Sequence, residues 1–170
     1  MASAKNVSPS SPVRSATGVP GASAVPVGIL RIDHVGIAVA DLDEAIDFYR
    51  RVFGMTCTHV EENAEQGVRE AMLQVGPTAG GGSLQLLAPL SPDSTIAKFL
   101  DRSGPGMQQL AYTVENVDVT CAELRSRGVR LLYDEPRRGT ADSRINFVHP
   151  KDAGGVLVEL VEPPSARTAD

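Results

Sequence analysis

The chain carries one segment pattern twice, and this internal repetition restricts its fold more than any other feature. Residues 33–43 align without a gap with residues 108–118, which places His34 on Gln109. In each copy an alternating apolar run leads directly into a helix start. Because duplicated supersecondary units stack and bury a shared core, we expect two similar modules.

Helix signals follow both copies of this segment. Asp41 is a candidate N-cap with Glu44 three residues later, and Gly54 ends the apolar pattern of the first helix. Asn116 and Gly128 hold the corresponding positions in the second copy. The sequence therefore predicts one helix after each of the two matching strands, the second one residue shorter than the first.

The last strand of each half also has a counterpart. Residues 83–89 lie over residues 157–163, which places Gln85 on Glu159. Each half holds two further strand-like runs between its helix and its last strand. These runs are residues 56–60 and 69–75 in the first half, and residues 129–133 and 144–148 in the second. The predicted fold class is α+β, with two tandem βαβββ modules that form a curved, cleft-bearing mixed sheet.

These patterns divide the chain into one domain and two tails. The domain is expected over residues 29–163, with module 1 at about 31–90, a linker helix at about 94–102 and module 2 at about 107–163. Residues 1–28 are rich in Ser, Ala, Pro and Gly and hold no acidic residue, so they are expected to form a disordered low-complexity tail. Residues 164–170 are expected to form a loose C-terminal tail.

Charge and cysteine content exclude several classes of partner. The net charge of -5 argues against broad binding of nucleic acid or anionic membranes, because both require a basic face. No apolar run approaches the length that crosses a bilayer. Cys57 and Cys121 lie in different segments without a metal-binding spacing, which is typical of reduced core residues in a cytoplasmic protein.

Four polar residues interrupt otherwise apolar strands at symmetry-related positions. The repeat pairs His34 with Gln109 and Gln85 with Glu159, so all four should converge between the modules. A buried carboxylate or amide costs several kcal/mol without a partner, and a divalent cation would satisfy all four at once. Taken singly, a strand histidine is more often a hydrogen-bonded core residue, and a glutamate near a strand end usually faces solvent. The repeat favours the metal site.

Two stretches of the chain are specific to one family: Glu65-Gln-Gly-Val-Arg-Glu70 and Arg144-Ile-Asn-Phe-Val-His-Pro-Lys151. Residues 33–39, 84–90, 134–139 and 156–159 fit the same family pattern. Through these stretches, which together cover nearly all of residues 31–163, the chain resembles the methylmalonyl-CoA epimerases of the vicinal-oxygen-chelate, or glyoxalase-like, superfamily.

The resemblance implies an isomerase that interconverts (2R)- and (2S)-methylmalonyl-CoA through a metal-stabilised enolate. It further implies that the chain forms a homodimer. It also implies that His34, Gln85 and Glu159 are metal ligands and that Glu70 is the catalytic base. By position, Glu159 is the nearest candidate for the acid that returns the proton, and a bound water is the alternative. Without the resemblance, Glu70 reads as an exposed strand carboxylate paired with Arg69 or Arg144.

Gln109 departs from the family pattern, which has a histidine pair where this chain has Gln108-Gln109. The amide oxygen of Gln109 is a neutral, harder and weaker donor than imidazole. The donor set therefore favours Co²⁺, with Mn²⁺, Mg²⁺ or Zn²⁺ as alternatives. The departure leaves two other readings open, an enzyme acting on a different acyl-CoA and a non-catalytic binder of a small ligand. Of the remaining histidines, His149 is expected to be structural and His59 exposed.

Because the protein is acidic overall, it needs a local group of basic side chains to bind the phosphates of coenzyme A. The densest basic group of the chain consists of Arg137, Arg138, Arg144 and Lys151, which could clamp these phosphates or the substrate carboxylate. For Arg137 and Arg138 a solvated loop is an equal alternative. Ser143 and Asn146 flank the same region and are candidates for hydrogen bonds to the acyl group.

Overall fold

The computed structural model describes residues 27–77 and 81–164 of the 170-residue chain. The predicted tails at residues 1–26 and 165–170 therefore lie outside the described residues. Residues 27 and 28, assigned above to the N-terminal tail, are held against the domain. The carbonyl of Val27 accepts a hydrogen bond from Thr120 Oγ1 at 3.0 Å, and that of Gly28 accepts one from the Glu115 amide at 3.3 Å.

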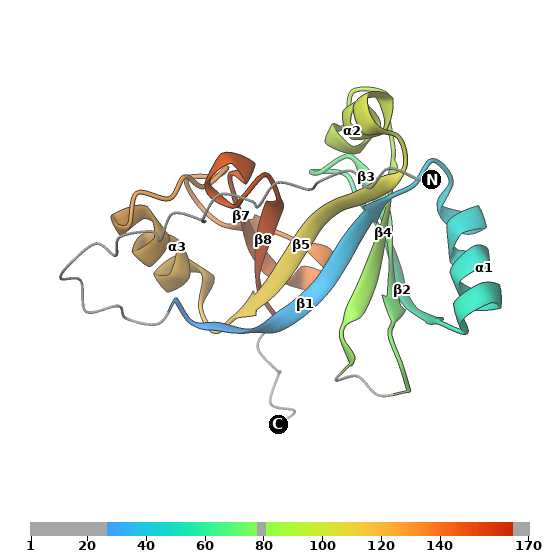
Figure 1. Ribbon diagram of the computed structural model, residues 1–170, viewed down its shortest axis with the longest axis horizontal. Coiled ribbons are helices and arrows are strands. Elements are labelled where there is room, and N and C mark those ends of the chain that lie inside the picture. The colour runs from blue at the N-terminus through green and yellow to red at the C-terminus, as the bar shows by residue number, and fades with distance from the viewer. Residues whose placement is uncertain (1–26, 78–80, 165–170) are drawn as a thin grey trace, which may run out of the picture.

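Each half of the chain builds a strand, a helix and further strands (Figure 1). The first half consists of β1 (Ile29–Ala38), α1 (Leu42–Phe53), β2 (Thr56–Asn63), β3 (Val68–Gln74) and β4 (Ser83–Pro89). The helix α2 (Thr95–Ser103) joins the halves. The second half consists of β5 (Gly106–Val114), α3 (Val117–Ser126), β6 (Arg137–Arg138), β7 (Arg144–Val148) and β8 (Leu157–Glu162), with short 3₁₀ turns at Thr140–Asp142 and Pro150–Asp152.

All eight strands form one mixed sheet in the order β2-β3-β4-β1-β5-β8-β7-β6. The first strands of the two modules, β1 and β5, pair antiparallel at the centre. Each of them pairs in parallel with the last strand of its own module, β1 with β4 and β5 with β8. The predicted arrangement of two βαβββ modules in a curved mixed sheet is therefore confirmed.

The helix starts agree with the capping residues predicted from the sequence. Asp41 Oδ1 accepts a hydrogen bond from the Glu44 amide at 2.9 Å, and Asn116 Oδ1 accepts one from the Val119 amide at 2.9 Å. Gly54 ends α1 in the left-handed region with a φ of 68°, which a residue without a side chain adopts without strain.

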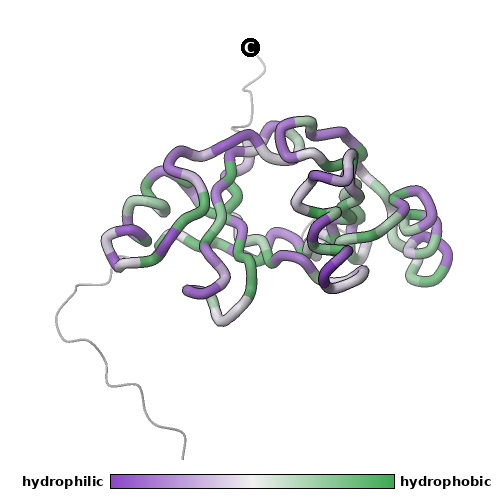
Figure 2. The backbone as a smooth tube through the Cα atoms, turned by 90° about the horizontal axis from the view of Figure 1, so that it is seen from above, coloured by the Kyte–Doolittle hydropathy of each residue, from purple (hydrophilic) through white to green (hydrophobic). Residues whose placement is uncertain are grey.

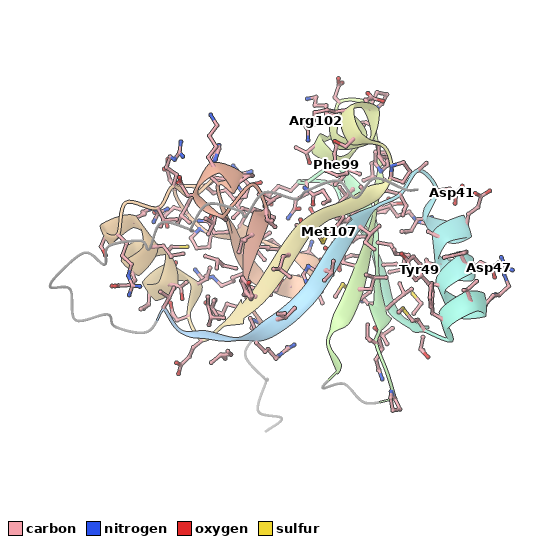
Figure 3. The ribbon with its side chains drawn as sticks, viewed as in Figure 1. Asp41, Asp47, Tyr49, Phe99, Arg102 and Met107 are labelled. Atoms are coloured by element: carbon pink, nitrogen blue, oxygen red, sulfur yellow. The ribbon has the colours of Figure 1, made fainter. Side chains whose placement is uncertain are left out.

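Each helix covers its own half of the sheet, so the molecule has a core on either side of the central strands (Figures 1 and 2). In the first half, Leu42 of α1 packs against Leu73 and Leu86, and Tyr49 points from α1 toward the sheet while Asp47 points away from it (Figure 3). In the second half, Val117 and Cys121 of α3 pack against Val114, Val148 and Leu160. Two further apolar clusters contain Val68, Leu87 and Phe147, which also line the cavity described below.

The strand predicted at residues 129–133 is wrong. Only Leu131 forms an isolated bridge, to Val148. The backbone of Arg130 and Leu132 pairs with β7, with Leu132 N donating to the Phe147 carbonyl at 2.8 Å and His149 N to the Arg130 carbonyl at 2.9 Å. This pairing ends at Tyr133, whose backbone groups bind the side chain of Asn146 on β7. Its Oδ1 accepts from the Tyr133 amide at 3.2 Å, and its Nδ2 donates to the Tyr133 carbonyl at 3.0 Å. A side-chain amide thus satisfies the backbone groups that a ladder would have paired, and the short strand β6 forms further on.

Among the residues that the structure describes, no helix has the length and apolar character needed to cross a membrane.

Candidate active site and metal centre

Four adjacent central strands each contribute one polar side chain to a buried cluster. His34 lies on β1, Gln85 on β4, Gln109 on β5 and Glu159 on β8. Their exposed fractions are 3%, 2%, 6% and 5%. The convergence predicted from the internal repeat is what the structure shows, because these strands are neighbours in the order β4-β1-β5-β8.

The amide nitrogen of Gln109 lies at the centre of this cluster. Gln109 Nε2 donates to Glu159 Oε2 at 2.5 Å and to Gln85 Oε1 at 3.1 Å, and it lies 3.4 Å from His34 Nε2. His34 Nε2 is also 3.1 Å from Glu159 Oε2. Three acceptor atoms from three strands therefore surround one point, which the Gln109 amide fills.

A glycine makes room for the Gln109 side chain. Gly36 on β1 lies opposite Gln109 in the β1–β5 register. A Cβ atom at position 36 would lie 2.5 Å from Gln109 Cγ and 3.3 Å from a methyl carbon of Leu87. A side chain at this position would push Gln109 out of its place, so Gly36 is part of how the cluster is built.

His34 is oriented by its sequence neighbour. Its Nδ1 lies 3.0 Å from Asp33 Oδ1, and Asp33 Oδ2 accepts a hydrogen bond from Thr113 Oγ1 at 2.6 Å. Burial favours the neutral ring, but the hydrogen bonds to Asp33 and Glu159 outweigh it and raise the pKa of His34 to about 9. The environment of this ring therefore attracts positive charge.

Glu70 lies on β3 beside the cluster and is only 2% exposed. Its Oε2 accepts from Gln85 Nε2 and its Oε1 accepts from Thr140 Oγ1, both at 2.9 Å. Burial raises the pKa of Glu70 to about 7; the Thr140 hydrogen bond opposes this rise, and the carboxylates of Glu61 and Glu159 add to it. Such a carboxylate is a stronger base than an exposed one, yet it still ionises near neutral pH.

The alternative reading of Glu70 as an exposed, arginine-paired carboxylate is wrong. Arg69 pairs with Asp43, with Nη1 2.9 Å from Oδ2. Arg144 pairs with Asp118, with Nη1 2.8 Å from Oδ2.

Sequence reasoning missed Thr140, which links Glu70 to the cluster. Besides donating to Glu70, its hydroxyl accepts from Gln85 Nε2 at 2.9 Å. Thr140 begins a short turn in which Ala141 and Asp142 have φ values of 52° and 60°, in the left-handed region. A lone threonine in a loop carries no periodic signal, so only the folded chain shows its position.

A cavity of about 300 Å³ opens onto these groups. Glu70, Gln85, Gln109 and Glu159 form its polar part. Its apolar wall consists of Val68, Leu87, Ile96, Leu132, Phe147 and Leu157. Apolar walls around a few convergent polar groups are typical of small-molecule sites.

Two of the predicted substrate-binding residues lie at cavities next to the cluster. Arg137 lines the cavity that contains Glu70 and stacks on the Tyr133 ring, with 4.0 Å from its guanidinium carbon to the ring centroid. Ser143 is buried and lines a smaller cavity of about 190 Å³ that also reaches His34 and Glu159.

The other four predicted substrate-binding residues lie elsewhere. Arg138 Nε donates to Asp142 at 2.7 Å, and Asn146 is fully buried with its amide on the Tyr133 backbone. Arg144 is held by Asp118 and by Glu162, whose Oε2 is 3.3 Å from Nη1. Lys151 is exposed in the 3₁₀ turn after β7. None of these four lines the cavity that contains Glu70.

Comparison with known proteins identifies the family. Residues 33–147 match the model of the Glyoxalase/Bleomycin resistance protein/Dioxygenase superfamily. The mitochondrial methylmalonyl-CoA epimerase of Mus musculus is 38% identical over 131 residues, which cover 76% of this chain and 71% of that protein. The chain belongs to the methylmalonyl-CoA epimerase family.

Solved structures of epimerases agree with this family. The crystal structure of methylmalonyl-CoA epimerase from Mycobacterium tuberculosis is 60% identical, with a TM-score of 0.77, and covers 80% of this chain and 89% of that chain. A variant of the Streptomyces coelicolor epimerase in complex with 2-nitronate-propionyl-CoA is 50% identical, with a TM-score of 0.76, and covers 81% of this chain and 99% of that chain.

Membership of the superfamily implies a divalent metal ion, and the donor atoms of this epimerase-family chain fit one. His34 Nε2, Gln85 Oε1 and Glu159 Oε2 already converge on one point. The Gln109 amide now fills that point, so an ion would bind there only once this side chain withdrew, and its amide oxygen would then be available as a fourth donor. No group of three or more His, Cys, Asp or Glu side chains is placed to hold a metal within residues 27–77 and 81–164, because two of these four donors are glutamines.

Proposed function

We propose that this chain interconverts the two C2 epimers of methylmalonyl-CoA by removing and returning the α-proton. The observation that carries this proposal is Glu70, a buried carboxylate with a pKa raised to about 7, on the wall of the same cavity as the four-residue cluster. A protein that only binds a small ligand gains nothing from keeping a carboxylate in that place, where burial disfavours its charge.

The reaction requires a base that is ionised and close to C2. The α-proton lies between a thioester and a carboxylate, so it is acidic for a proton on carbon. Glu70 Oε1 and Oε2 are held by Thr140 and Gln85, so the carboxylate is fixed before substrate enters. Glu70 takes the proton from one face, and the negative charge moves to the thioester oxygen.

The charge of the enolate needs an electrostatic partner in the cavity. A divalent ion held by His34, Gln85, Glu159 and the amide oxygen of Gln109 would supply that positive charge. Because three of the four donors are oxygens, we expect Co²⁺ first and Mn²⁺, Mg²⁺ or Zn²⁺ as alternatives.

The second face of the substrate requires a second acid. Glu159 on β8 lines the same cavity from the second module, whereas Glu70 on β3 belongs to the first. We assign to Glu159 the return of the proton, so that the substrate carbon lies between the two modules. Arg137, at the cavity wall and stacked on Tyr133, is our candidate for anchoring a negatively charged part of the acyl-CoA.

The active form is proposed to be a homodimer in the cytoplasm. Ile29, Leu30, Ile32 and Met107 on the paired central strands β1 and β5 are 50%, 62%, 55% and 61% exposed. Exposed apolar side chains on neighbouring strands favour burial against a second copy. Both cysteines are free thiols, in keeping with a reducing compartment.

Deuterium exchange tests the activity directly. Protein loaded with Co²⁺ or Mn²⁺ is incubated with methylmalonyl-CoA in D₂O, and deuterium at C2 is followed by NMR. We expect deuterium uptake with the wild type. The control Glu62→Gln changes an exposed glutamate on β2 and should show the same uptake. Glu70→Gln should abolish it. No uptake above background in the wild type would refute the function, and undiminished uptake in Glu70→Gln would refute the base.

A further inference from the structure

A β-bulge interrupts the pairing of β1 with β5 next to the polar cluster. The register shifts by one residue after the Gly36–Gln109 pair, so Gln108 has no counterpart on β1. In a regular strand, consecutive side chains point to opposite faces, and a bulge re-aims one of them. Here Gln108 and Gln109, although consecutive, both line the cavity that contains Glu70. The bulge therefore adds a second amide of β5 to the cavity wall.

The amide oxygen of Gln108 is buried and lacks a hydrogen-bond partner. Its Oε1 is among the buried side-chain atoms to which no group of the described residues donates. The side-chain amides of Gln66, Gln85 and Gln109 line the same cavity, but each already donates to another group. A buried acceptor without a donor costs free energy. A ligand that brings an N–H group to Gln108 Oε1 would therefore gain affinity from this contact.

The proposed substrate carries such a donor close to the reacting carbon. The carboxylate and the thioester of the methylmalonyl group have only acceptor atoms. Beyond the sulfur atom, the pantetheine arm of coenzyme A continues with two methylene groups and then a secondary amide, whose N–H donates. The cavity wall offers a matching surface, since Val68, Leu87 and Ile96 are apolar and Gln108 holds the unpaired acceptor.

We propose that Gln108 Oε1 accepts a hydrogen bond from the pantetheine amide nearest the sulfur atom and so positions the acyl group. This inference rests on the proposed epimerase function and names the part of the substrate that the cavity selects. Gln108 and Gln109 are neighbours on β5, so the hydrogen bond would hold the arm directly beside the polar cluster. The thioester and the α-carbon would then lie between that cluster and Glu70, which line the same cavity.

Two truncated substrates that differ in one group test this hydrogen bond. The first is the methylmalonyl thioester of N-acetylcysteamine, which keeps the amide N–H, and the second has an ester oxygen in place of that N–H. Protein loaded with Co²⁺ or Mn²⁺ exchanges the C2 proton of each in D₂O, at a protein concentration high enough to measure slow rates. We expect kcat/KM of the wild type to favour the amide about fivefold to tenfold, the effect of one hydrogen bond.

Gln108→Leu removes the acceptor, so kcat/KM should become about equal for the two thioesters. Because this preference is a ratio measured on one variant, a general loss of activity or stability cancels from it. Gln74→Leu, at the far end of β3 where the amide donates to the Gly76 carbonyl, is the matched control and should keep the preference. Gln108→Asn, whose amide is one methylene shorter, should also lose it, and serves should leucine disturb the bulge.

Equal rates with the two thioesters in the wild type would overturn the inference, because a water molecule would then satisfy Gln108. A preference that survives in both Gln108 variants would overturn it too, since another group would then accept from the N–H. Exchange with methylmalonyl-CoA but with neither thioester would show that the first amide does not position the acyl group. All three outcomes leave the epimerase function standing, whereas a wild type without exchange on methylmalonyl-CoA would overturn both.

Discussion

Gln109 Nε2 lies 2.5 Å from Glu159 Oε2 although the two residues belong to β5 and β8, 50 positions apart. The same nitrogen contacts Gln85 Oε1 and lies near His34 Nε2. A neutral NH₂ group thus partly satisfies acceptors that would hold a cation more strongly. To admit a metal ion, this amide must turn or move, and the hydrogen bonds it gives up weaken the net affinity for the ion.

Replacing Gln109 by histidine should therefore tighten metal binding. An imidazole donates a ring nitrogen to Co²⁺ or Zn²⁺ without first breaking an amide hydrogen bond to Glu159. We expect the dissociation constant to fall by about tenfold or more, as measured by calorimetry or chelator competition. Gln74→His, at the far end of β3 where the amide donates to the Gly76 carbonyl, is the control. An unchanged affinity in Gln109→His would show that position 109 is not a ligand.

Gly36→Ala should damage the site more than the fold. The new methyl group would lie 2.5 Å from Gln109 Cγ, so the Gln109 side chain has to shift. We expect weaker metal binding and lower epimerase activity, with a loss of unfolding free energy of about 1 to 3 kcal/mol. Gly106→Ala is the matched control on β5, since a Cβ there has open space around it. Equal metal affinity in the two variants would contradict the packing argument.

Glu70→Gln should make the metal-free protein more stable at high pH while removing activity. The folded pKa of Glu70 is about 7 against an ordinary value of 4.5, so the folded state holds the proton more tightly. The stabilisation that protonated Glu70 contributes is fully present below the ordinary pKa of 4.5, and it is lost as the pH rises through the folded pKa of about 7. We expect the free energy of unfolding of Glu70→Gln to exceed that of the wild type by about 2 to 3 kcal/mol at about pH 8. At about pH 4.5 the difference should be small. Urea unfolding at both pH values measures this, and Glu62→Gln should show no such difference.

Thr140→Val should shift the pH dependence of activity to higher pH. The Thr140 hydroxyl stabilises ionised Glu70, so its loss raises the pKa of a base that must be ionised to act. In the wild type, kcat/KM should rise with pH around 7. In Thr140→Val the midpoint should lie roughly half to one pH unit higher, the equivalent of one hydrogen bond of about 1 kcal/mol. Thr140→Ser keeps the hydroxyl and should keep the wild-type midpoint.

The parts of the fold and site that follow from local or repeated patterns were predictable. Asp41 and Asn116 cap their helices within three residues of themselves, so the sequence contains the whole interaction. The four-residue cluster was predictable because the duplication relates its members in pairs. Thr140 was not, because its contacts span 55 and 70 positions and no repeat partner marks them.

The missing strand at residues 129–133 has a similar cause. Its alternating residues suit a strand, but the side chain of Asn146 takes the backbone groups of Tyr133 that a neighbour would have paired. Pattern reasoning assigned the Asn146 amide to the substrate, since sequence alone does not distinguish a polar group that binds a ligand from one that pairs with backbone.

The central pairing of β1 with β5 also bears on how this protein reaches its native state. The two strands are about 75 residues apart along the chain, and their pairing brings the halves of the polar cluster together. Joining such distant segments is slow compared with forming either module, because a long loop must close first. Each module can therefore collapse early while the cluster is still divided between them. Metal added during refolding should find its tight site only in this last phase.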